Sequence, residues 1–157
     1  MEIRAVEVLL RTLTIAALIL TATTAVGEDS GGTAKVSVWS GIYTAAQSKR
    51  GETVHRVSCA FCHGPTLNGA GQPDMPPSPS IAGADLLRKW SGKTVAELFV
   101  YVQKEMPTDN PGSLKEQDTI DSIAHMFAVS EIPAGDKELP PDANTLANII
   151  IEQQKKK

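Results

Sequence analysis

The chain has few aromatic residues, few cysteines and no excess of positive charge. Its 157 residues include three Phe, two Trp and two Tyr, so few large side chains can fill a core, and a bound cofactor could supply the missing volume. Two cysteines are too few for a disulfide-dense secreted scaffold. A net charge of −3 argues against general nucleic-acid binding, which needs a basic face. The length fits one domain and excludes a large multidomain enzyme.

Residues 1–27 have the pattern of a secretory signal peptide. Arg4 and Arg11 precede a short apolar run over residues 13–22, and small residues follow up to Gly27. The alternative is an uncleaved anchor helix, but the run is shorter than the roughly 20 residues that a membrane span needs. We therefore expect cleavage near the end of this segment, a periplasmic or otherwise exported bacterial protein, and no membrane span in the mature form.

The rest of the chain predicts an all-α domain with irregular ends. Residues 28–38 are rich in Gly, Ser, Thr and charge without periodicity, which indicates a flexible lead. Residues 39–139 are interpreted as the folded domain, because helical patterns follow one another there and strand signals are absent. Residues 140–157 are interpreted as a polar extension that includes one more short helix over 143–153.

The first predicted helix leads into a long loop. Thr44 is a suitable helix cap, and the helix runs to about Ala60 with Val54, Val57 and Phe61 on one apolar face. Glycines and prolines over residues 64–80 then predict irregular structure. A loop of that length in a small domain is usually functional, and we expect it to wrap around a bound group.

Three further helices are predicted before the polar extension. A short one covers residues 84–90, and a second begins at the capping box formed by Thr94 and Glu97 and ends before Met106. The third opens with a second capping box, Ser113 with Glu116, and continues to about Val129; its apolar stripe consists of Ile120, Ile123, Ala124 and Phe127.

The reactive residues of the chain are concentrated in the sequence Cys59-Ala60-Phe61-Cys62-His63. Two thiols three positions apart at the end of a helix lie close together, and the next residue turns an imidazole to the same side. Each thiol can add to one vinyl group of a haem while the imidazole binds its iron. The motif therefore predicts one haem c, held covalently by thioethers at Cys59 and Cys62 and ligated by His63.

Two other readings of the paired cysteines are weaker. A thioredoxin-like dithiol would open a helix in a strand-rich unit, whereas this pair closes a helix in a chain without strand signals. A zinc site would need two further ligands, and only His55 and His125 remain as histidines. Haem attachment is favoured over both.

The motif supplies only one axial ligand of the iron, and in electron-transfer proteins a methionine thioether usually supplies the other. Met106 follows a predicted helix in an irregular segment, where Pro107 fixes the backbone and the side chain can project inward. Met126 sits within a predicted helix and is interpreted as core filler, and Met75 is so close to His63 in sequence that the loop would have little slack. Met106 is favoured over Met75 and over an open site.

Four segments together match the pattern of one family: residues 41–47, the pair Arg50 and Gly51, the haem motif with Gly64, and residues 106–114. With them the sequence resembles the class I c-type cytochromes, and more narrowly the small cytochrome c domains associated with pyrroloquinoline-quinone-dependent alcohol dehydrogenases. The resemblance covers about residues 39–139. It implies helices wrapped around one covalently attached haem, His63 and Met106 as axial ligands, and single-electron transfer through an exposed haem edge.

The resemblance also assigns Pro79, Ile81 and Trp90 to the haem pocket. In similar cytochromes the carbonyl at the position of Pro79 accepts a hydrogen bond from the proximal histidine, which orients the ring and raises its basicity. Trp90 resembles a position near the haem propionates. The alternatives are that Pro79 only forms a turn and that Trp90 only packs.

One departure from the family concerns the crossing of its first and last helices. Gly51 allows the close approach found in similar cytochromes, but His55 and His125 stand where aromatic residues are expected. If the alignment holds, the two imidazoles lie near each other and resist double protonation. The alternative is two partly exposed histidines that do not meet.

Two classes of function follow. The first is a soluble electron carrier with transient redox partners, a dehydrogenase as donor and an oxidase or another cytochrome as acceptor. The second is a haem enzyme or sensor with an open or labile sixth iron site. A peroxidase would want a distal base and a cation, and no His or Arg occurs in residues 98–114, so the carrier is favoured.

Overall fold

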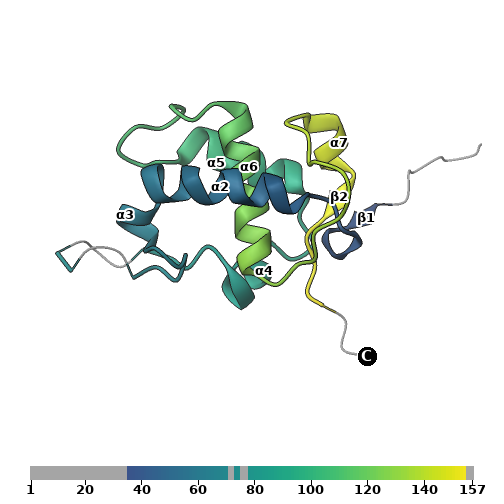
Figure 1. Cartoon of the computed structure of the whole chain (residues 1–157), viewed down its shortest axis with the longest axis horizontal. Coiled ribbons are helices and arrows are strands. Elements are labelled where there is room, and N and C mark those ends of the chain that lie inside the picture. The colour runs from purple at the N-terminus through teal and green to yellow at the C-terminus, as the bar shows by residue number, and fades with distance from the viewer. Residues whose placement is uncertain (1–34, 71–72, 75–77, 155–157) are drawn as a thin grey trace, which may run out of the picture. The chain divides into compact units, whose positions relative to one another are not determined.

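Helices α2 (Ala45–Ser58) and α6 (Glu116–Val129) cross each other at the centre of the fold (Figure 1). The computed structural model describes residues 35–70, 73–74 and 78–154 of the chain. The other elements in this part of the chain are, in order, β1 (Val36–Ser37), η1 (Val38–Ser40), α3 (Ala60–His63), α4 (Gly83–Trp90), α5 (Val95–Glu105), α7 (Ala143–Ala147) and β2 (Ile149–Ile150). The fold is mostly helical, as the sequence predicts.

Gly51 is the point of closest approach between α2 and α6. A Cβ atom on Gly51 would lie 1.8 Å from the carbonyl oxygen of Asp121 and 3.0 Å from the Cβ of His125. Only a residue without a side chain lets the two backbones come this close. The expectation that Gly51 permits the crossing is confirmed.

The buried face of α2 is polar, so the predicted apolar face of this helix is wrong. Val57 is 81% exposed and Phe61 is 59% exposed, whereas the buried residues of α2 are Gln47, Gly51 and His55. Gln47 and His55 can face inward because each side chain forms a hydrogen bond with a backbone group. Gln47 donates to the carbonyl of Leu139 and accepts from its N–H, both at 2.8 Å.

An ion-pair network lies beside the crossing. The guanidinium of Arg50 on α2 donates to both carboxylate oxygens of Asp121, at 2.7 and 3.1 Å, and to both oxygens of Glu138, at 2.8 and 3.0 Å. The side chain of Asp121 is only 4% exposed and also accepts from Gln117 at 2.8 Å. These bonds raise the pKa of Arg50 and lower that of Glu138, so both of these groups stay charged at neutral pH.

The starts of α2 and α5 agree with their predicted caps. The hydroxyl of Thr44 accepts from the N–H of Gln47 at 3.1 Å, and Thr94 with Glu97 forms the predicted capping box. These are local patterns in which a side chain satisfies a free N–H of the first helical turn.

The second predicted capping box, at Ser113, is wrong. Helix α6 begins at Glu116 with Lys115 at the cap and no side-chain cap bond. The N–H of Ser113 instead donates to the carbonyl of Asn110 at 3.3 Å, which closes a turn and delays the helix. The apolar stripe predicted for α6 is nevertheless confirmed, because all four of its residues are fully buried: Ile120, Ile123, Ala124 and Phe127.

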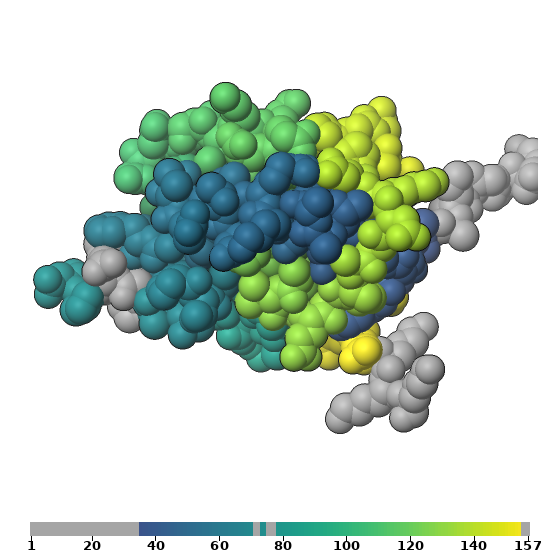
Figure 2. All heavy atoms as spheres, viewed as in Figure 1, coloured from purple at the N-terminus to yellow at the C-terminus, as the bar shows by residue number. Residues whose placement is uncertain are grey.

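The segment after residue 139 belongs to the core rather than to a polar extension. Leu146 and Ile151 are fully buried, and α7 ends at Ala147, well before the predicted end of that helix. The β-branched run that follows forms β2, which pairs in parallel with β1, a pairing for which the sequence analysis found no strand signal. In Figure 2 the yellow residues of this region lie directly against the blue atoms of the first described elements.

Parts of the sequence interpretation fall outside this description. The predicted signal peptide at 1–27 and most of the lead at 28–38 lie outside the described residues, as do residues 155–157. Within the described residues, none of the helices combines the length and the apolar character needed to cross a membrane.

Replacing Gly51 with alanine is expected to destabilise the fold by about 2 kcal/mol or more, because the added methyl group collides with the backbone of Asp121. Helix propensity alone has the opposite sign and would stabilise the variant by about 1 kcal/mol. Chemical denaturation followed by circular dichroism measures the difference. The exposed Thr53 on the same helix gives the control, since Thr53→Ala should change stability by less than about 0.5 kcal/mol. Equal or greater stability of Gly51→Ala would contradict the crossing described here.

Candidate functional site

The two cysteines and His63 lie where α2 passes into the single turn of α3. Cys59 ends α2, with its N–H donating to the carbonyl of His55 at 2.9 Å, and its own carbonyl accepts from the N–H of His63 at 2.9 Å. Both cysteines are half-buried with free thiols, and His63 is buried. The backbone bonds of one short helical turn therefore hold the two thiols and the imidazole together.

The environment of Cys59 does not suit a reactive dithiol. Burial, with a smaller contribution from Cys62, raises the pKa of Cys59 to about 11, so the thiol stays protonated at neutral pH. Redox-active dithiols need a lowered thiol pKa, because the thiolate is the nucleophile. A zinc site has no support in the described part of the chain, which contains no group of three or more Cys, His, Asp or Glu able to hold a metal.

The ring of His63 is oriented by the backbone of Pro79. Its Nδ1 lies 2.9 Å from the Pro79 carbonyl oxygen. Because a carbonyl only accepts, Nδ1 carries the hydrogen, and Nε2 is left with a free lone pair for a metal. The predicted hydrogen bond between these residues is confirmed.

The loop that follows α3 folds back on the same residues. The N–H of Gly69 donates to the carbonyl of His63 at 2.8 Å, and the N–H of Ile81 donates to the carbonyl of Leu67 at 2.9 Å. Leu67 is only 1% exposed, so the loop is anchored in the core by its side chain. The predicted loop is therefore ordered on both sides of the stretch at 71–77, part of which lies outside the described residues.

A cavity of about 320 Å³ brings the predicted site residues together. Its wall includes all of the residues predicted to bind or ligate a haem: Cys59, Cys62, His63, Pro79, Ile81, Trp90 and Met106. Apolar side chains from three helices complete it, namely Leu86 of α4, Leu98 and Val102 of α5, and Met126 of α6. Among the described residues, no Asp or Glu lines this cavity.

Met106 enters the cavity from the end of α5. It caps that helix, with its N–H donating to the carbonyl of Val102 at 3.1 Å, and it is half-buried. Met126 is 6% exposed and belongs to the hydrophobic core, as the sequence predicted, and it also lines the cavity. Met75, the other candidate weighed from the sequence, lies outside the described residues.

Trp90, Tyr101 and Lys89 form another part of the wall, and Lys93 packs on the Trp90 ring. The rings of Trp90 and Tyr101 meet edge to face with their centroids 5.4 Å apart. The Nζ atom of Lys89 lies 5.2 Å from the centroid of Tyr101, and that of Lys93 lies 5.0 Å from the centroid of Trp90. Lys89 and Tyr101 line the cavity but were not selected from the sequence. The available signal was spacing, since Tyr101 lies three positions after Leu98 on the same face of α5.

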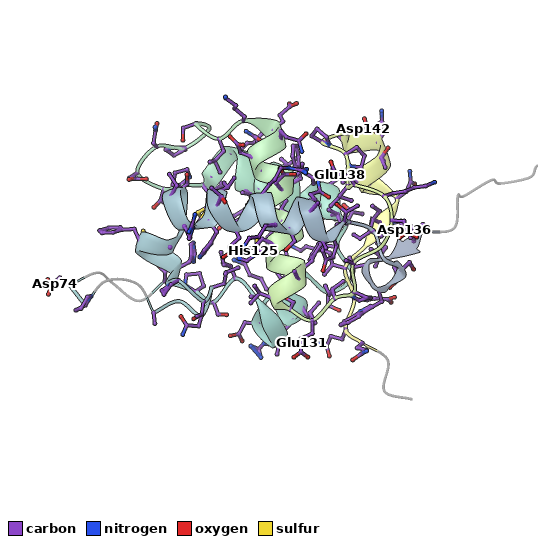
Figure 3. All side chains as sticks on the ribbon, viewed as in Figure 1. Asp74, His125, Glu131, Asp136, Glu138 and Asp142 are labelled. Carbon is purple, nitrogen blue, oxygen red and sulfur yellow. The ribbon has the colours of Figure 1, made fainter. Side chains whose placement is uncertain are left out.

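The histidines of the α2–α6 crossing meet, as the resemblance implied. The ring centroids of His55 and His125 are 5.8 Å apart, and Figure 3 shows His125 on α6 beside α2. Burial lowers the pKa of both rings below the ordinary value of 6.5, and for His125 the neighbouring His55 lowers it further. Both rings are therefore held in the neutral form.

The fold and the cavity define a c-type cytochrome domain, with a Cys-x-x-Cys-His turn facing a pocket enclosed by helices. In comparison with known families, the sequence model described as cytochrome C oxidase, cbb3-type, subunit III matches residues 46–126, from α2 to α6. This stretch is just over half of the 157-residue chain, so the chain belongs to that family. Membership makes it a haem protein of electron transfer rather than an enzyme. No curated protein and no solved structure matches the chain.

Mild acid is expected to destabilise the protein through the histidine pair. Because the folded-state pKa of each ring is lowered, the unfolded chain binds protons that the folded chain does not. Stability is then complete above about pH 6.5, falls as the pH drops below that value, and levels off below the folded-state pKa values.

The free energy of unfolding, measured between about pH 7 and about pH 5, checks this expectation. His125→Phe should lose roughly half of the pH slope, since one of the two depressed histidines is removed. The lowered carboxyl pKa values of Glu52 and Glu138 start from an ordinary value of 4.5, so their effects fall below this window. If the free energy of unfolding depends on pH equally in wild type and His125→Phe, then His125 does not contribute to the acid destabilisation.

Proposed function

We propose that this chain is an exported mono-haem cytochrome c that carries single electrons between a dehydrogenase and a respiratory acceptor. The observation that supports it most is the convergence of the thiols, the imidazole and the Met106 thioether on one cavity. Residues 1–27 support export, because they have the three-part pattern of a secretory signal.

The residues present fit a haem. Cys59 and Cys62 would hold it by thioethers, with His63 Nε2 and the sulfur of Met106 as axial ligands. The apolar side chains of α4, α5 and α6 suit the faces of a porphyrin, and the absence of carboxylates from the described wall suits its propionates, for which Lys89, Trp90 and Tyr101 offer a cation and polar hydrogens. When bound, the haem supplies a one-electron iron couple.

The side chains around the cavity determine how readily the iron gives up an electron. The Pro79 carbonyl holds the proton on Nδ1 of His63 and so raises the basicity of the ring. The thioether of Met106 is soft and uncharged, which favours the ferrous state, and apolar walls disfavour the extra charge of the ferric state. If His63 and Met106 both ligate the iron, oxygen and small substrates would have no place to bind.

We propose the redox partners from the electron-transfer role, the sequence resemblance and the net charge of the chain. Electron transfer needs a brief contact, so the interface with each partner should be small. The donor is a dehydrogenase, and the sequence resemblance points to quinoprotein alcohol dehydrogenases. The acceptor is an oxidase or another cytochrome. The chain carries a net charge of −3, so basic partner surfaces would be attracted to it in a salt-dependent manner.

The visible spectrum of the protein, exported in a host that attaches haem c, tests this function. We expect sharp ferrous bands, a weak long-wavelength ferric band from sulfur ligation, and no change on adding carbon monoxide, because no iron position is open. A high-spin spectrum that responds to carbon monoxide would favour the haem enzyme or sensor instead. If the protein carries no haem, the haem assignment is wrong and the two cysteines act as thiols instead.

Replacing Met106 with alanine should lower the midpoint potential and let the iron bind cyanide or carbon monoxide, because the thioether that favours ferrous iron is lost. Met126→Leu is the matched control, since it removes the other thioether of the described cavity wall while keeping its volume and should leave the spectrum unchanged. If Met106→Ala kept the sulfur-to-iron band and Met126→Leu lost it, the ligand would be Met126. Retention of the band in both variants would move the assignment to Met75.

A further inference from the structure

His55 belongs to two structural features at once. It sits on the buried face of α2 at the crossing with α6, where it is 2% exposed, and it lines the same cavity as His63. Similar cytochromes use an aromatic ring at this place, which needs only to fill space. A ring with nitrogen atoms can in addition form directional bonds.

The ring of His55 binds the backbone directly after the axial imidazole. Its Nε2 lies 2.8 Å from the carbonyl oxygen of Gly64, the residue that follows His63. The carbonyl only accepts, so His55 donates and its hydrogen is on Nε2. Gly64 has a φ of +76°, which marks a sharp turn of the chain at this residue.

The same carbonyl begins a series of bonds that leads to the partner of the axial ring. It also accepts from the N–H of Leu67 at 3.2 Å, and the carbonyl of Leu67 accepts from Ile81 at 2.9 Å. Ile81 lies two residues after Pro79, whose carbonyl orients His63. The loop is therefore fixed at one end by α2 and at the other by the hydrogen bond to the imidazole.

We propose that His55 is a positioning residue for the axial imidazole: its bond to Gly64 fixes the backbone beside His63 and, through the loop, supports the hydrogen bond between His63 and Pro79. This inference rests on the proposed function, because it concerns the same haem site. Without the His55 bond, the His63–Pro79 bond should lengthen and the ring should become less basic. The ferric state then loses stabilisation and the midpoint potential rises.

His125 provides a matched control in the same helix crossing. Its ring packs against that of His55, with centroids 5.8 Å apart, but within the described chain it donates or accepts no hydrogen bond. His55→Phe and His125→Phe each place the same aromatic group in the crossing, and only the first removes a bond to the loop. His55→Gln is the conservative variant, because a glutamine amide places a donor near the position of Nε2.

The experiment measures the midpoint potentials of the three haem-loaded variants beside wild type. His55→Phe should shift the ferrous-to-ferric equilibrium constant about threefold to tenfold toward ferrous, or about 30 to 60 mV upward for one electron. His125→Phe should shift it less than about twofold, and His55→Gln should return most of the way to wild type. Equal shifts in the two phenylalanine variants, or no shift in His55→Phe, would show that His55 only packs in the crossing and does not position His63.

A measurement on the wild-type protein does not depend on whether the variants fold. Nitrogen-15 NMR should find the His55 ring with its hydrogen on Nε2, exchanging slowly with water; the other tautomer would overturn the inference. Wild-type protein without haem would overturn the proposed function and this inference together. An unaltered potential in haem-loaded His55→Phe would overturn this inference alone.

Discussion

Helix α2 approaches α6 so closely that the two backbones touch at Gly51, and the geometry of the cavity depends on this contact. Helix α2 continues directly into the turn that carries the thiols and His63, while α6 contributes Ser122 and Met126 to the opposite part of the cavity wall. The depth of the crossing therefore sets how far Cys59, Cys62 and His63 lie from the α6 side chains of the cavity wall. Arg50 secures the crossing through its bonds to Asp121 on α6, and His55 ties α2 to the turn at Gly64.

The cavity divides its chemistry among separate elements. The turn at α3 carries Cys59, Cys62 and His63, the loop after it orients the His63 ring through Pro79, and the end of α5 brings Met106 to the wall. Helices α4, α5 and α6 supply apolar surface. In the proposed cytochrome, the turn at α3 would hold the haem, while the loop and Met106 would adjust its potential.

Sequence reasoning succeeded where a few adjacent residues decide the outcome. The Cys-x-x-Cys-His turn and the capping box at Thr94 each follow from one local chemical requirement, whereas the close contact at Gly51 was predicted only through the family resemblance. It failed where the partner is remote in sequence. Gln47 faces inward on α2 because it bonds the backbone of Leu139, 92 positions away, and the pairing of β1 with β2 joins residues more than a hundred positions apart. Periodicity carries no information about such partners.

The pairing of β1 with β2 brings the two flanks of the described chain to one side of the molecule. Val36 lies opposite Ile149, and the indole N–H of Trp39 donates to the carbonyl of Glu152 at 2.9 Å. Figure 1 shows these strands at the end of the domain remote from α3. A tag, tether or fused domain attached at either flank would therefore emerge from the same side, and the end that carries the haem motif would stay open to a colliding redox protein.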